Sequence, residues 1–304
     1  MNSMDRRSIL SGLGVMGLGL SGCARQTESA RSAPATPRGA QSLDLEALET
    51  RHGGRLGFAV RHTATGQTLA WRGEERFVYC STFKMYLAAA TLVRVQDGKE
   101  RLDRAIPVAA ADMINHAPVT EPAIGRTLTV EALMKGTVEV SDNPAANILI
   151  RELGGIAAMQ AFYRSLGDMR TRVDRLEPEM NRLDGDKDTI APAQSALNIE
   201  NLFVAADTPL TAGSRNRLLG WMTTTPTGQA RIKAGVPAGW RVAHKTGTGG
   251  YGPTNDIGLI YPPSGSPIIV AAYFHATDAS TDAQREAVIA DATRLALTAI
   301  GATA

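Results

Sequence analysis

The sequence of 304 residues has few aromatic residues, 5%, and no excess of charge, since 32 Lys and Arg face 30 Asp and Glu. A balanced charge leaves no basic footprint for a nucleic acid. No apolar run reaches the roughly 20 residues that a permanent transmembrane helix needs, which excludes a polytopic membrane protein. The hydrophobic fraction of 43% is ordinary for a globular protein with a large core.

Cysteine is also scarce, because the chain has only Cys23 and Cys80. Cys23 ends a segment that begins with Arg6-Arg7 and continues as a short apolar, Gly-rich stretch, the pattern of an export signal. The arginine pair resembles a twin-arginine signal, and Leu20-Ser21-Gly22-Cys23 resembles a lipobox, whose cysteine is lipidated. The alternative is a plain secretory signal in which these features coincide.

We therefore expect residues 1–22 to be an export signal and residues 23–42 to be a lipidated cysteine followed by a flexible tether. The tether is rich in Ala, Ser, Pro and Arg and lacks apolar periodicity. These features predict a monomeric lipoprotein, exported and anchored to a membrane on its periplasmic or extracytoplasmic side. Cys80 is then left as a reduced, buried thiol with no partner for a disulfide.

Strand-like and helical patterns divide the remaining chain into three blocks. Strands are expected at 55–60 and 68–71, around a hairpin turn, and again at 240–246, 255–261 and 268–274. Helical periodicity appears at 83–93, 128–138, 144–153, 156–166, 192–206, 212–223 and 282–300. The prediction is an α/β fold in which both chain ends form one antiparallel sheet flanked by helices, with an all-α lobe inserted. Residues 43–80 and 230–304 would form the α/β lobe and 81–229 the helical lobe, with a site between them.

Ser81 and Lys84 are the first candidates for chemistry. They are three residues apart at the predicted start of a helix, so their side chains share one face. A serine nucleophile needs a neighbouring base, and burial lowers the pKa of a lysine enough for that role. Alone, the pair is weak evidence, because Ser81 would also suit a helix cap.

Two further motifs favour a catalytic role for Ser81 and Lys84. Ser141-Asp142-Asn143 precedes Pro144, a residue suited to a helix's first position, and Lys245-Thr246-Gly247 lies on a predicted strand. The set S-x-x-K, S-D-N and K-T-G resembles that of class A β-lactamases and penicillin-binding proteins. Arg175-Leu176-Glu177-Pro178-Glu179-Met180-Asn181 is similar to the active-site loop of class A, which penicillin-binding proteins lack. Pro178 holds Glu177 extended and permits a cis bond that would aim its carboxylate inward.

The resemblance covers roughly residues 43–304, and its motifs look like those of the mycobacterial and broad-spectrum cephalosporin-hydrolysing branches of class A. It implies the serine β-lactamase fold and hydrolysis of penicillins and cephalosporins through an acyl-serine, without a cofactor or metal. By this resemblance Ser81 is the nucleophile, Lys84 and Glu177 are candidate acylation bases, and Glu177 with Asn181 holds the hydrolytic water. Ser141 and Lys245 would relay protons and bind substrate. The oxyanion hole would be formed by the backbone of Ser81 and Thr248, and the substrate would contact Asn143, Thr246, Thr248, Ser141, Arg231 and His116.

Some positions depart from the family pattern or leave alternatives open. His116 stands where the family usually has an aromatic ring and could be a plain surface histidine, while Arg231 could be a solvated arginine at a helix end. His244 replaces a usual aspartate, and the loop from Arg175 to Asp188, normally tied by an ion pair, is about two residues shorter than expected. Two rival functions remain: a penicillin-binding D,D-peptidase or β-lactam sensor, and a catalytically silent envelope-binding lipoprotein.

Overall fold

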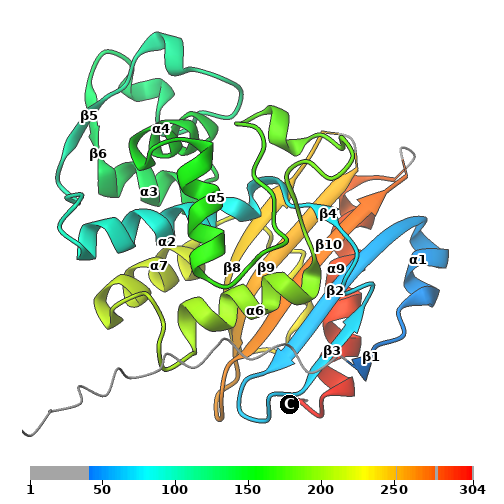
Figure 1. Cartoon of the computed structure of the whole chain (residues 1–304). Coiled ribbons are helices and arrows are strands. Elements are labelled where there is room, and N and C mark those ends of the chain that lie inside the picture. Colours follow the sequence, from blue (N-terminus) through cyan, green and yellow to red (C-terminus); the bar gives the residue numbers. More distant parts are fainter. Residues whose placement is uncertain (1–40, 251, 278–279, 303–304) are drawn as a thin grey trace, which may run out of the picture. The chain divides into compact units, whose positions relative to one another are not determined.

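The computed structural model describes residues 41–250, 252–277 and 280–302, so the predicted export signal and Cys23 lie outside the described residues. Its centre is a six-stranded sheet with the order β1-β3-β2-β10-β9-β8 (Figure 1). The strands are β1 (Gln41–Ser42), β2 (Gly54–His62), β3 (Thr68–Trp71), β8 (Arg241–Thr248), β9 (Pro253–Tyr261) and β10 (Ile268–Ala276).

Segments from both ends of the described chain build this sheet, as the sequence predicts. Strand β10 pairs antiparallel with β2 on one side and with β9 on the other, so that Ala271 faces Ala59 and Ile257. Strand β1 pairs parallel with β3, which places Gln41 in the sheet although we expected it in the tether. The other end of the strand order is β8, which leaves the motif Lys245-Thr246-Gly247 on an edge strand.

Side chains alternate between the two faces of the sheet and enter two different cores. On β10, Ala271 and Tyr273 belong to the core shared with the helical block, whereas Val270 and Phe274 belong to the core beneath the terminal helices. This alternation follows from the period of two in an extended strand. The second core is covered by α1 (Glu46–His52), α8 (Ile232–Gly235) and α9 (Asp282–Ala299).

Most of the other helices form a block beside the sheet, around the helix α2 (Phe83–Gln96) (Figure 1). Residues 83–92 of α2 are all buried, because α3, α4, α5 and α7 pack around it. The helices of the middle segment are α3 (Val130–Glu139), α4 (Asn143–Leu153), α5 (Ile156–Ser165), α6 (Pro192–Phe203) and α7 (Ala212–Thr224). Helix α6 packs on β2 and β10, so the range 81–229 includes one helix that covers the sheet.

Short elements connect these layers. Two small antiparallel sheets pair β4 (Phe77–Val78) with β7 (Thr189–Ile190), and β5 (Ala105–Pro107) with β6 (Thr127–Thr129). Single 3-10 turns are η1 (Cys80–Thr82), η2 (Ala110–Asp112), η3 (Glu121–Ala123) and η4 (Glu179–Asn181). No helix in the part of the chain that the structure describes is both long and apolar enough to cross a bilayer.

Helix α4 begins one residue earlier than the sequence indicates. Asn143, not Pro144, is its first residue, and Pro144 is the second. The reason is that Asp142 caps the helix, since its Oδ1 accepts a hydrogen bond of 2.8 Å from the N–H of Ala145. The same carboxylate accepts the N–H groups of Val119 and Thr120, which ties the loop before α3 to the motif Ser141-Asp142-Asn143.

Candidate active site

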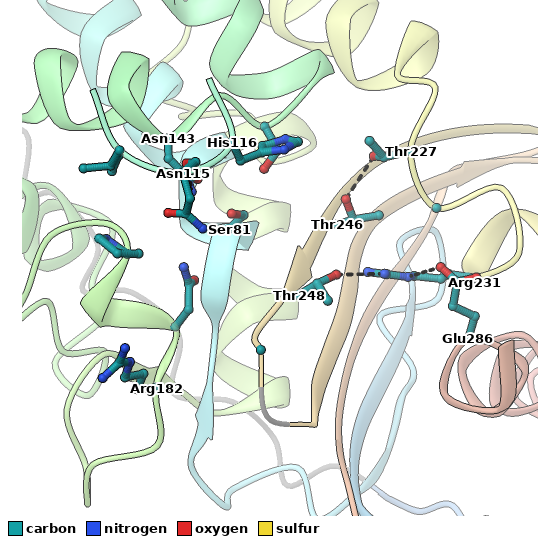
Figure 2. Close-up of a pocket in the computed structure, with 16 residues that line it drawn as sticks. Ser81, Asn115, His116, Asn143, Arg182, Thr227, Arg231, Thr246, Thr248 and Glu286 are labelled. Atoms are coloured by element: carbon teal, nitrogen blue, oxygen red, sulfur yellow. Dashed lines mark hydrogen bonds and ion pairs between the residues drawn. The ribbon is translucent and has the colours of Figure 1, made fainter. Parts of the chain in front are cut away.

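A cavity of about 870 Å³ lies between η1, the edge strand β8, the loop that carries Asn181 and the segment around Asn115 (Figure 2). Its volume is within the range of sites for drug-sized ligands. The predicted site residues that line it are Ser81, His116, Ser141, Asn143, Asn181, Arg231, Thr246 and Thr248. Lys84, Glu177 and Lys245 are buried beside it and contact the lining residues Ser81 and Ser141.

Ser81 lies in the 3-10 turn η1, which runs directly into α2. It does not cap the helix. Its hydroxyl donates instead to Oε1 of Glu177 at 3.2 Å. Because η1 and α2 are continuous, the Ser81 hydroxyl is held at the positive end of a helix, where negative charge is stabilised.

Lys84 follows one turn later and is completely buried. Its Nζ lies 3.0 Å from Oε1 of Glu177 and donates to Oδ1 of Asn143 at 2.5 Å and to the carbonyl of Ser141 at 2.7 Å. Burial lowers the pKa of Lys84, and the Glu177 carboxylate opposes that shift. A lysine with a lowered pKa gives up its proton more readily, which suits an acid–base group.

Ser141 connects the two buried lysines. Its Oγ lies 3.3 Å from Nζ of Lys84 and 3.2 Å from Nζ of Lys245. Burial and the nearby Lys84 charge hold the pKa of Lys245 well below its usual range. The backbone of Ser141 is left-handed, with φ of 61°, a conformation that non-glycine residues adopt at a cost and that is common at functional sites.

Glu177 is held by contacts to its backbone as well as to its side chain. The side-chain amide of Asn147 donates to the Glu177 carbonyl at 2.8 Å and accepts the Glu177 N–H at 3.0 Å. The carboxylate also accepts a hydrogen bond from Nδ2 of Asn181, and the Glu177-Pro178 bond is cis. Asn147 was not among the predicted site residues, although its spacing of four residues from Asn143 on α4 places both on one helix face.

The loop that carries Glu177 is closed by the ion pair that we expected between its ends. Nε of Arg175 lies 2.6 Å from Oδ2 of Asp188, whose side chain is fully buried. Oδ1 of Asp188 also accepts the backbone N–H of Asp174 at 2.8 Å and that of Arg175 at 3.0 Å. The loop is therefore anchored at the point where it leaves and rejoins the body of the protein.

Arg231 is buried, which rules out the alternative of a solvated arginine at a helix end. Its Nη2 donates to Oγ1 of Thr248 at 2.8 Å, and its Nη1 donates to the carbonyl of Asn255 at 2.8 Å. Nε forms an ion pair of 3.0 Å with Glu286 of α9, a partner that the sequence analysis did not identify. Figure 2 shows Glu286, Arg231 and Thr248 in line along one wall of the cavity.

His244 turns its buried side chain toward β9, where it meets Asp256. Nδ1 of His244 lies 2.9 Å from Oδ2 of Asp256, and the same carboxylate oxygen accepts the N–H of Ile232 at 3.2 Å. His244 is paired with Gly258 across the two strands, so Asp256 is its diagonal neighbour on the same face. His244, which stands where the family usually has an aspartate, thus has a carboxylate partner that could not be predicted from the sequence.

Two glycines allow strand β8 and the chain after it to approach η1 and η4. A Cβ at Gly247 would lie 2.7 Å from the carbonyl oxygen of Tyr79, and a Cβ at Gly249 would lie 2.6 Å from that of Asn181. Cys80 is buried in this contact, as we expected, and forms no disulfide within the part of the chain that the structure describes. Burial raises the pKa of its thiol, which therefore stays protonated.

His116 is exposed at the rim of the cavity, with a left-handed backbone and Nε2 2.8 Å from the carbonyl of Val140. It is thus both a surface histidine and a cavity residue. In the described ranges, no three His, Cys, Asp or Glu side chains converge as metal ligands would. The arrangement instead provides a hydroxyl nucleophile, two lysines and a carboxylate in one connected network, which suits acyl transfer.

Comparison with known proteins matches residues 42–300 to the model of the Beta-lactamase enzyme family. The chain is 39% identical over 250 residues to β-lactamase CTX-M-6 of Salmonella typhimurium, covering 82% of this chain and 85% of that protein. It is 40% identical to β-lactamase L2 of Stenotrophomonas maltophilia, covering 90% of each. A solved structure described as an ancestral (GNCA) class A β-lactamase superposes with a TM-score of 0.81 at 48% identity, covering 84% of this chain and 98% of that one. With the family model matching residues 42–300 and the serine, lysines and glutamate converging on one cavity, the chain belongs to the class A serine β-lactamases.

Proposed function

We propose that this chain hydrolyses the amide bond of the β-lactam ring in penicillins and cephalosporins, and so confers resistance to them. The observation that carries the proposal is the contact of 3.2 Å between the Ser81 hydroxyl and the Glu177 carboxylate. A nucleophile and a second base in one network serve both halves of a covalent hydrolysis. A penicillin-binding D,D-peptidase or β-lactam sensor would need only the first half.

In the acylation half, Ser81 Oγ attacks the β-lactam carbonyl carbon and loses its proton to a neighbouring base. Glu177 contacts the hydroxyl directly, and Lys84 lies 3.0 Å from the same carboxylate oxygen, so the proton can pass to either group. The ring C–N bond then breaks, and the leaving nitrogen takes a proton from Ser141, which Lys245 and Lys84 resupply. The backbone N–H groups of Ser81 and Thr248 would hold the oxyanion, an effect of about 3 kcal/mol per donor in related chemistry.

In the deacylation half, a water bound by both Glu177 and Asn181 would attack the ester carbonyl. Glu177 takes one proton from that water, and Ser81 Oγ regains a proton as the ester bond breaks. Asn147 and the Arg175–Asp188 ion pair support this step, because they fix the backbone of Glu177 and the ends of its loop. A general base placed in this way contributes typically about 10²–10⁴-fold to a rate.

The substrate's own carboxylate would bind along β8. Thr246, Thr248 and Arg231 line the same wall of the cavity, and Arg231 is bonded to Thr248 at 2.8 Å. Asn143 would take the acylamino group through its side-chain amide, whose oxygen is already fixed by Lys84. His116 lies at the rim of the cavity beside Asn115, and it would contact the substrate from the side that faces the β8 wall.

The experiment that tests the function separates the two halves of the reaction. Glu177→Ala should accumulate an enzyme heavier by one intact penicillin in mass spectra, with turnover reduced by about 10²–10⁴-fold. Ser81→Ala should lose both turnover and adduct. Glu179→Ala, two residues along the same loop, is the matched control and should keep turnover. A Glu177→Ala enzyme that hydrolysed penicillin at the wild-type rate would contradict the proposal.

The proposed place of action is outside the cytoplasmic membrane. Arg6-Arg7, the apolar stretch after them and Cys23 support export as a lipoprotein that is anchored through a lipid on Cys23. The residues from 24 to 40, rich in Ala, Ser and Pro, would give the enzyme domain reach from the membrane. We propose that the anchored enzyme acts as a monomer.

A further inference from the structure

The charged side chains that line the cavity are unevenly balanced. They are Arg182, Arg231 and Glu286. Arg231 and Glu286 form an ion pair of 3.0 Å, so the charge on that wall is compensated. Arg182 is exposed, and its guanidinium has neither a hydrogen bond nor an ion pair with any described residue. The described lining therefore contains one uncompensated positive charge.

The other basic side chains of this loop each have a carboxylate partner. Arg175 pairs with Asp188 at 2.6 Å, and Lys187 pairs with Asp184 at 2.7 Å. The backbone of Arg182 is nevertheless fixed, because its carbonyl accepts Nη2 of Arg175 at 2.8 Å and its N–H donates to the carbonyl of Glu179 at 3.2 Å. Among the described residues, the Arg182 guanidinium thus has no partner, while its backbone is fixed.

The position of Arg182 determines which part of a substrate it can meet. Figure 2 shows Arg182 on the loop side and Arg231 on the strand side, with Ser81 between them in the view. A bicyclic β-lactam carries its ring carboxylate on one side of the reactive carbonyl and its acylamino group on the other. With the carbonyl at Ser81, the ring carboxylate at Arg231 and the acylamino amide at Asn143, the far end of the acylamino side chain would extend toward Asn181 and Arg182, which line the same cavity.

We propose that Arg182 is a specificity-determining residue that binds an anionic group on the acylamino side chain of the substrate. The cavity would then prefer β-lactams with a second negative charge over neutral analogues of the same size. This inference rests on the proposed function. It assigns Arg182 a role in substrate choice and none in the bond-breaking steps.

Carbenicillin and benzylpenicillin form a matched pair of probes, since they differ by one carboxylate on the acyl side chain. The quantity to measure is the ratio of kcat/KM for carbenicillin to kcat/KM for benzylpenicillin. Arg182→Gln should lower this ratio by about two- to fivefold, the size expected for an exposed ion pair, and Arg182→Lys should largely restore it. Added salt should lower the ratio of the wild type and leave that of Arg182→Gln unchanged.

Arg101→Gln is the control for net charge, because Arg101 is exposed and does not line the cavity. It should leave the ratio unchanged. The inference is overturned if Arg182→Gln keeps the wild-type ratio, or if it lowers kcat/KM equally for both penicillins. The same preference can be measured without turnover. The dissociation constants of both penicillins are determined for the Ser81→Ala protein and for the Ser81→Ala/Arg182→Gln protein, and their ratios are compared. Failure of the wild type to hydrolyse benzylpenicillin would instead count against the proposed function.

Discussion

At the residue scale, the site depends on amines placed where water cannot reach them. Lys84 and Lys245 are completely buried, and burial lowers the pKa of each. The Ser141 hydroxyl contacts both amines, at distances of 3.3 and 3.2 Å. A hydroxyl between two amines can donate to one and accept from the other, so a proton can move through it without a large rearrangement. In the proposed mechanism, Ser141 would therefore relay protons while Ser81 acts as the nucleophile.

Substitution of Arg231 tests whether substrate binding can be separated from the bond-breaking steps. Arg231→Ser should raise KM for penicillins more than it lowers kcat, because the interaction with the ring carboxylate is present in the ground state and the transition state alike. Steady-state kinetics with several β-lactams provide the measurement. The Arg101→Gln protein serves again as the control, since it loses one exposed cation elsewhere. An unchanged KM for every substrate would mean that Arg231 only braces Thr248 and β9.

At the scale of elements, the loop from Arg175 to Asp188 joins stability to hydrolysis. Its two ends meet at the buried Asp188 carboxylate, and its middle carries Glu177 and Asn181. The loop also touches the nucleophile's turn, since the carbonyl of Asn181 lies 3.9 Å from the Sγ of Cys80. A substitution at the ends of the loop should therefore shift the side chains of Glu177 and Asn181, the residues proposed to hold the hydrolytic water.

Asp188→Asn keeps the size of the side chain but removes its charge from the pair with Arg175. Breaking a buried ion pair costs about 3–5 kcal/mol, and because Arg175 is 20% exposed we expect a smaller loss of about 1–3 kcal/mol in unfolding free energy. Deacylation should slow as well. Thermal unfolding and pre-steady-state acyl-enzyme accumulation measure the two effects. Asp184→Asn, on the same loop but exposed, should change neither; equal effects of the two substitutions would refute the anchoring role of Asp188.

The sequence predicted those elements whose pattern is local. The strand-like stretches at 255–261 and 268–274, the helix after Ser81 and the three motifs are each contained in a short stretch, and the structure places them as expected. Contacts between distant segments were missed because no local pattern encodes them. His244 meets Asp256 only through the register of β8 on β9, and Arg231 meets Glu286 only because α9 packs beside α8. The two-residue strand β4 is too short to leave a signal.

At the scale of the whole molecule, the domain and its proposed tether have separate tasks. Cys23→Ser should move the native protein from the detergent phase to the aqueous phase on phase partitioning, because the lipid would be lost. The kcat/KM for benzylpenicillin should stay unchanged, since the catalytic groups all lie after residue 80. A native protein found wholly in the aqueous phase before the substitution would disprove the anchor. A change in kcat/KM would disprove the separation of tasks.

The order of strands in the sheet also determines at which point of synthesis the active fold can form. The first hairpin, β2–β3, pairs with β10, a strand that the ribosome adds about 200 residues later. Until β10 is made, β2 has an unpaired edge whose backbone groups can form hydrogen bonds with strands of other chains. A message that stopped just before Ile268 would encode the nucleophile, both lysines and the glutamate, yet its product would lack the strand that joins the two ends. Such a truncated gene would give an aggregating polypeptide and no resistance.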